Sequence, residues 1–148
     1  MQAAAAPEDS FQTAFRGHFT GLLSWGQLDA FWQVVRQNAS AGWYLYAVGE
    51  AVPTQTSNAE QVLDFVREVD GLLRTEHRED YCGIVYTDST TEPRLIKIFD
   101  PNNLGVSCGY SDNPPLPGWV MSLIPPRELQ GRRPLPGNRR RWWQKLWA

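Results

Sequence analysis

Apolar residues in the N-terminal part of the chain recur at helical spacing. Over residues 10–23 they stand three and four positions apart, which predicts a helix. Ser24 lies three positions before Gln27, the spacing of a capping box, so a second helix is expected to begin directly after the first. Its apolar residues share one face, and residues 38–42 supply the polar, glycine-containing stop. The two segments predict a helical hairpin.

The next part of the chain predicts a strand followed by a third helix. Residues 43–52 (WYLYAVGEAV) are apolar on both alternating faces, which is typical of a buried strand in the middle of a sheet. Ser57 and Glu60 have capping-box spacing, and the apolar period after them predicts a helix over residues 58–76. A crossover through this helix would allow the strand to run parallel to a neighbour.

Short apolar runs separated by turn sequences fill the rest of the body. Residues 81–87 and 94–99 are joined by a polar segment and predict a hairpin. The sequence DPNN at residues 100–103 is typical of a turn and leads to a short predicted strand over residues 104–110. After the proline-rich loop SDNPPLPG, residues 119–124 predict the last strand.

These elements define an α+β fold. The order is helix, helix, strand, helix and four strands, and it predicts a mostly antiparallel sheet of about five strands in a single domain. A chain of 148 residues agrees with one domain, which we place at residues 1–126, the body. No apolar run approaches the roughly 20 residues of a bilayer span, and the N-terminus lacks the features of a secretory signal, so a cytoplasmic location is expected.

Residues 127–148 differ from the body in charge and composition, and we call them the tail. The tail holds seven Lys and Arg residues against one Glu, so it carries +6 while the body carries −8. Three of the seven Trp residues of the chain also lie in the tail. A linker rich in proline and arginine is expected first, and a short amphipathic helix after it. Because such a helix of about ten residues is unstable alone in water, it needs a surface on which to fold.

The tail carries the functional expectation. Trp and Arg are favoured anchors of protein interfaces, so we expect a small accessory or adaptor protein without enzymatic activity that binds a protein partner, or a second copy of itself, through the tail. Permanent docking of the tail on its own body is an open alternative. An anionic membrane surface and nucleic acid are others, although the acidic body disfavours the latter. The expected partner-binding residues are Arg139, Arg140, Arg141, Trp142, Trp143, Lys145, Leu146, Trp147 and, in the last strand, Trp119.

A second group of side chains predicts an alternative, a small enzyme or ligand-binding site. Residues 76–82 (EHREDYC) gather a histidine, three carboxylates and a thiol, and Asp100 and Cys108 are expected on neighbouring strands. A charged loop after a helix has the same composition, and no second pair of ligands stands at matching spacing, so no metal site and no cofactor are expected. Cys82 and Cys108 are expected to be reduced thiols, because the chain lacks a secretory signal.

Overall fold

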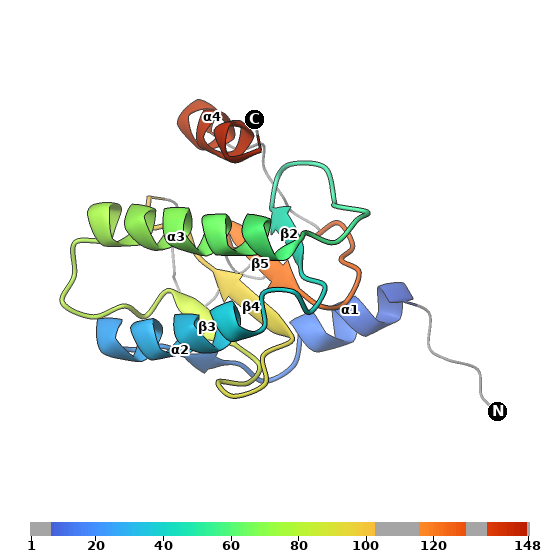
Figure 1. Ribbon diagram of the computed structural model, residues 1–148, viewed down its shortest axis with the longest axis horizontal. Coiled ribbons are helices and arrows are strands. Elements are labelled where there is room, and N and C mark those ends of the chain that lie inside the picture. The colour runs from blue at the N-terminus through green and yellow to red at the C-terminus, as the bar shows by residue number, and fades with distance from the viewer. Residues whose placement is uncertain (1–6, 103–115, 130–135, 148) are drawn as a thin grey trace, which may run out of the picture.

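The computed structural model describes residues 7–102, 116–129 and 136–147. These residues form an α+β fold with four helices and one five-stranded antiparallel sheet, which confirms the predicted fold class and the order of its elements (Figure 1). The elements are α1 (Pro7–Phe15), β1 (Thr20–Gly21), α2 (Trp25–Gln37), β2 (Tyr44–Ala47), α3 (Ala59–Glu76), β3 (Val85–Thr87), β4 (Leu95–Ile98), β5 (Trp119–Ser122) and α4 (Gly137–Leu146). The strand predicted over residues 104–110, with Cys108, lies outside the described residues.

The strands follow the order β1-β3-β4-β5-β2, and each neighbouring pair is antiparallel. Strands β3 and β4 form the predicted hairpin, with Val85 opposite Ile98. Strand β5 lies between β4 and β2, so Trp119 stands opposite Ile98 on one side and Ala47 on the other. The expectations that β2 is central and has a parallel neighbour were wrong: β2 ends the sheet order and pairs antiparallel with β5.

Two apolar cores explain why β2 is apolar on both faces although it ends the sheet. Helices α2 and α3 lie side by side over one face, where Leu45 and Ala47 of β2 join the larger core (Figure 1). Phe11 of α1 packs with the opposite face, where Tyr46 and Val48 join a smaller core. Successive residues of β2 therefore enter opposite cores, as the alternation of a strand requires.

The first helix is shorter than the apolar period predicted. It ends at Phe15 rather than at residue 23, and Thr20–Gly21 form strand β1 beside β3. The predicted hairpin of two helices was wrong, because β1 separates α1 from α2 and the two helices pack in different cores. A Cβ atom at Gly21 would lie 2.9 Å from the Tyr86 ring, so this close strand pairing requires glycine. Leu22 is buried here as a residue of the strand edge, not of a helix. Because Leu22 is also buried, its position in the sequence matched the apolar spacing of a longer helix.

Capping boxes begin both long helices. At α2 the Ser24 hydroxyl accepts a hydrogen bond from the Gln27 amide at 3.0 Å, as predicted. At α3 the box consists of Asn58 and Gln61, one residue later than expected. The Ser57 amide instead donates to a backbone carbonyl at residue 43, which fixes Ser57 in the preceding loop.

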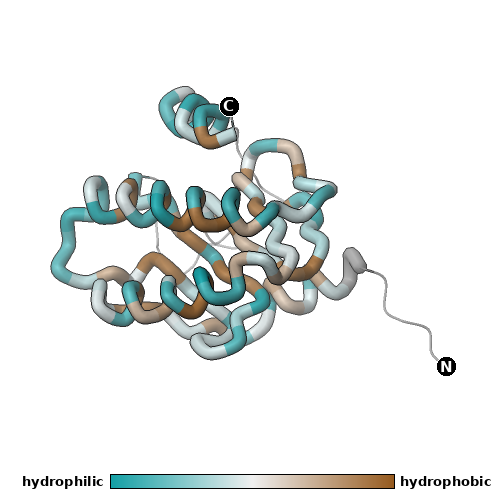
Figure 2. The backbone as a smooth tube through the Cα atoms, viewed as in Figure 1, coloured by the Kyte–Doolittle hydropathy of each residue, from teal (hydrophilic) through white to brown (hydrophobic). Residues whose placement is uncertain are grey.

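Figure 2 shows apolar residues on the sheet side of α2 and α3, whereas α4 is hydrophilic along most of its length. Of the helices in the described ranges, none has both the length and the apolar composition that a membrane span needs.

Candidate functional site

The C-terminal helix α4 packs on the body and buries a charged residue there. Arg139 is only 4% exposed, the one residue of α4 classed as buried, while Trp142 and Trp143 are half-buried against the larger core. These three residues stand at positions i, i+3 and i+4 and therefore share one face of the helix. We call this the inner face of α4. The open question of whether the tail docks on its own body is thus answered for these residues.

The Arg139 guanidinium lies between two carboxylates of the body. It donates to both oxygens of Asp100, with Nε to Oδ2 at 2.7 Å and Nη2 to Oδ1 at 2.9 Å. It also donates to both oxygens of Glu76, with Nη2 to Oε1 at 2.8 Å and Nη1 to Oε2 at 3.0 Å. Paired bonds of this kind are the strongest contacts that arginine makes with carboxylates. Arginine is therefore matched to this position in shape as well as in charge.

The pKa shifts follow from these bonds. The hydrogen bond with Asp100 raises the pKa of Arg139, and the bonds with Glu76 raise it further against the effect of burial. The hydrogen bond from Arg139 lowers the pKa of Glu76 below its ordinary value of 4.5. Both groups are consequently held in their charged forms at neutral pH.

The two carboxylates belong to separate elements of the body. Glu76 is the last residue of α3, and Asp100 follows strand β4 in the predicted turn, where its Oδ1 accepts a bond from the Asn102 amide at 2.9 Å. The Asn102 side chain donates to Glu76 and so links the two acidic positions. Gly118 approaches closely, because a Cβ atom there would lie 3.1 Å from the Asp100 Cβ. The turn at residues 100–102 therefore holds Asp100 in place and, through Asn102, links it to Glu76.

Aromatic rings continue the contact along α4. Trp142 packs against Trp119, with ring centroids 5.4 Å apart, and against Phe65 at 6.4 Å. Trp143 meets the edge of Phe65 at 6.1 Å and Trp147 at 5.2 Å. Trp119 is fully buried, and its indole N–H has no acceptor among the described residues. We call Glu76, Asp100, Phe65 and Trp119 the receptor surface.

The opposite side of α4 is basic and exposed. Arg140 pairs at 3.4 Å with Glu50, whereas Arg141 and Lys145 have no ion pair with any described residue. We call these three cations the outer face. Leu146 stands seven positions after Arg139 and therefore belongs to the inner face; it and Trp147 are partly buried against the larger core. The predicted partner-binding residues are thus divided, with Arg139 and Trp119 inside the protein and the outer face at its surface.

The charged segment at residues 76–82 also has some side chains inside the protein and others at its surface. His77 caps the C-terminal end of α3 and is buried, with Nε2 2.8 Å from the Cys82 carbonyl oxygen, while Glu79 and Asp80 are exposed. Cys82 is a buried free thiol whose pKa is raised by burial. Within the described ranges, no three His, Cys, Asp or Glu side chains are grouped so as to hold a metal ion.

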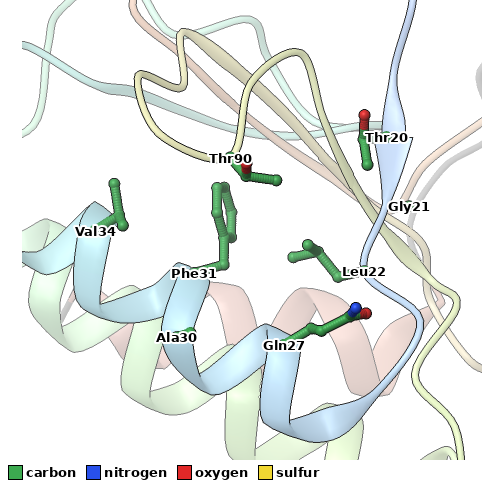
Figure 3. Close-up of a pocket in the computed structure, with 8 residues that line it drawn as sticks. All are labelled: Thr20, Gly21, Leu22, Gln27, Ala30, Phe31, Val34 and Thr90. Atoms are coloured by element: carbon green, nitrogen blue, oxygen red, sulfur yellow. The ribbon is translucent and has the colours of Figure 1, made fainter.

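A shallow apolar pocket of about 320 Å³ lies elsewhere, between strand β1 and helix α2 (Figure 3). Leu22 and Phe31 project into it, and Thr90 of the β3–β4 loop stands beside them. Its described lining holds two threonine hydroxyls and one glutamine amide but no titratable side chain.

The sequence predicts that Glu76 and Asp100 lie near each other, but it does not predict that Arg139 binds both carboxylates. Phe65 carries no functional signal in the sequence, because it is one of the apolar residues of the helix predicted over residues 58–76. The opposite charges of tail and body are the one sequence signal that pointed toward this contact. In comparisons with protein-family models, curated proteins and solved structures, no match to this chain was found.

Proposed function

We propose that the protein is a non-enzymatic adaptor that presents the outer face of α4 to an acidic surface of a protein partner. The observation that carries this proposal is the docking of α4 through its inner face. The contacts of Arg139 fix the helix, and the outer face points away from the receptor surface. A helix that is folded before its partner arrives loses less conformational entropy on binding than a free peptide would.

The residues of the tail have different roles in this proposal. Arg141 and Lys145 supply charge to the partner, and the partly exposed Trp147 supplies apolar area beside them. Arg139 and Trp119 act as positioning residues, because they are buried against the body. Long-range attraction between the outer face and an acidic partner speeds association, and the aromatic contact slows dissociation.

The alternative of a small enzyme at Glu76 and Asp100 has less support. Both carboxylates are bonded to Arg139, so neither is free to move a proton or to hold a substrate while α4 is docked. Anionic membranes and nucleic acids remain targets that a basic outer face also suits, and the experiment below separates them.

The test compares two charge-matched variants of the full chain. Arg141→Gln/Lys145→Gln removes two cations of the outer face, and Arg67→Gln/Arg94→Gln removes two exposed cations of the body. Capture of proteins from nuclease-treated extract is quantified by mass spectrometry. We expect a set of acidic proteins to be retained by wild type and by the body variant and lost by the outer-face variant. Equal capture by both variants would contradict the proposal.

Two further measurements decide between targets. If binding to a phosphatidylserine vesicle, rather than to protein, depends on the outer face, the target is a membrane. If capture requires nucleic acid and falls steeply between roughly 50 and 200 mM salt, the target is nucleic acid.

A further inference from the structure

The receptor surface has the features of a binding site for a helix. It combines two carboxylates, which bond one guanidinium through both of their oxygens, with two aromatic side chains that receive two Trp rings. The sequence it recognises in α4 is Arg-x-x-Trp-Trp, residues 139–143. Among the described residues, the hydrogen bonds that join α4 to the body come from side chains, and the α4 backbone bonds within its own segment.

Charge explains why this site selects an arginine-bearing helix. Without α4, Glu76 and Asp100 would face one another with no cation bonded to either in the described structure, and two neighbouring carboxylates repel. While α4 is docked, the Asp100 side chain is only 7% exposed, so Arg139 rather than water satisfies its carboxylate oxygens. A guanidinium satisfies four carboxylate oxygens at once, which an ammonium cannot do in the same planar geometry.

Helix α4 is not expected to remain folded after it leaves the receptor surface. Helix α4 has ten residues, no side-chain N-cap and one buried residue, so it is expected to unfold in water once it is undocked. A released α4 is therefore stabilised only by an equivalent surface. Among the described residues, the surface that matches it is the same receptor surface on another molecule of the chain.

We propose that the receptor surface binds the Arg-x-x-Trp-Trp helix of a second copy of the chain, so that two copies exchange their α4 helices. Exchange repeats each contact of the present structure across a two-fold axis and creates no unpaired charge. The seven residue steps from Leu129 to Pro136 span at most about 25 Å, so two bodies that exchange helices lie against one another. This site uses the inner face of α4, whereas the adaptor function is proposed for the outer face, which the inner face positions.

Two complementary full-length variants test the exchange. Arg139→Gln has an intact receptor surface and a defective helix, and Asp100→Asn has an intact helix and a defective receptor surface. We expect each variant to be monomeric alone in analytical ultracentrifugation and an equimolar mixture to form a one-to-one heterodimer. The matched control is Arg141→Gln, which keeps both the inner face of α4 and the receptor surface and should show the same proportion of dimer as wild type. A mixture of Arg139→Gln and Asp100→Asn that stays monomeric would overturn the proposal.

Fluorescent peptide 136–148 gives a second measurement. The resident helix has an effective concentration of about 1 mM, so micromolar peptide should bind wild type weakly. We expect at least ten-fold tighter binding to Arg139→Gln, and the same peptide carrying Arg139→Gln should not bind. Equal binding of the peptide to wild type and to Arg139→Gln would contradict the claim that the peptide binds at the receptor surface.

A third arm avoids substitutions in the site, in case Arg139→Gln fails to fold. A protease site replaces part of residues 130–135 in an otherwise wild-type chain, and the cleaved protein is mixed with the fluorescent peptide. We expect the peptide to replace α4 while the body keeps its cooperative melt. Retention of the original helix until the body unfolds would overturn the exchange.

Discussion

Helices α3 and α4 both pack on the larger core, but different forces hold them. Helix α3 buries six apolar side chains, whereas α4 buries one arginine and leaves its Trp rings half-exposed. The contact of α3 depends on apolar area, which salt and mild acid hardly change. The contact of α4 depends on two charged carboxylates. We therefore expect α4 to undock under conditions that leave α3 in place.

The largest effect should follow removal of a buried contact of α3. Leu73→Ala empties a fully buried position, so we expect a loss of about 2–5 kcal/mol in the free energy of unfolding, measured in urea. Leu63→Ala is the matched control on the same helix, because Leu63 is 40% exposed, and it should change stability by about 0.5 kcal/mol. Similar losses in both variants would show that burial does not distinguish the two positions.

Arg139→Gln should have a smaller effect that is confined to α4. We expect a loss of about 1–3 kcal/mol, because the carboxylates regain water once the helix undocks. Hydrogen exchange should show that the amides of α4 lose protection while those of α3 keep theirs. The exposed Arg141→Gln is the control and should leave both helices protected. If α3 lost protection together with α4, the two helices would form one cooperative unit and the comparison would fail.

Acid should separate the two helices without any substitution. The pKa of Glu76 is lowered in the docked state, so its contribution is present above its ordinary pKa of 4.5 and is lost as the pH falls through the docked-state pKa. We therefore expect α4 to undock below about pH 4.5 while α3 stays folded, as measured by hydrogen exchange. Glu76→Gln should lack this part of the acid transition. An unchanged acid profile in Glu76→Gln would assign the transition to other groups.

Two glycine substitutions should give the smallest effects, with opposite signs. Gly118→Ala places a Cβ atom 3.1 Å from the Asp100 Cβ and should weaken docking of α4 less than Arg139→Gln does. Gly71→Ala lies on α3 with open space around its Cβ and should stabilise the body by about 0.5–1 kcal/mol. Thermal melts report the second variant, and hydrogen exchange of α4 reports the first. If Gly71→Ala destabilised the body instead, the higher helix propensity of alanine would be outweighed by the loss of a contact that only glycine allows.

The amino-acid sequence by itself determined the features that depend on neighbouring residues. The capping box of Ser24 and Gln27, the helix ending at Glu76 and the β3–β4 hairpin all follow from contacts a few positions apart. The charge division between body and tail was also plain from the sequence, together with the need of a short helix for a surface.

Only the tertiary structure decided the features that join distant residues. Strand β1 forms because Gly21 meets Tyr86, and β2 ends the sheet because β5 returns between it and β4. Arg139 finds its carboxylates 39 and 63 positions away along the chain. Local spacing does not record such pairings, because they depend on where the turn at Asp100 and the end of α3 meet in space. That meeting point made one arginine of a basic tail an internal residue and left its neighbours at the surface.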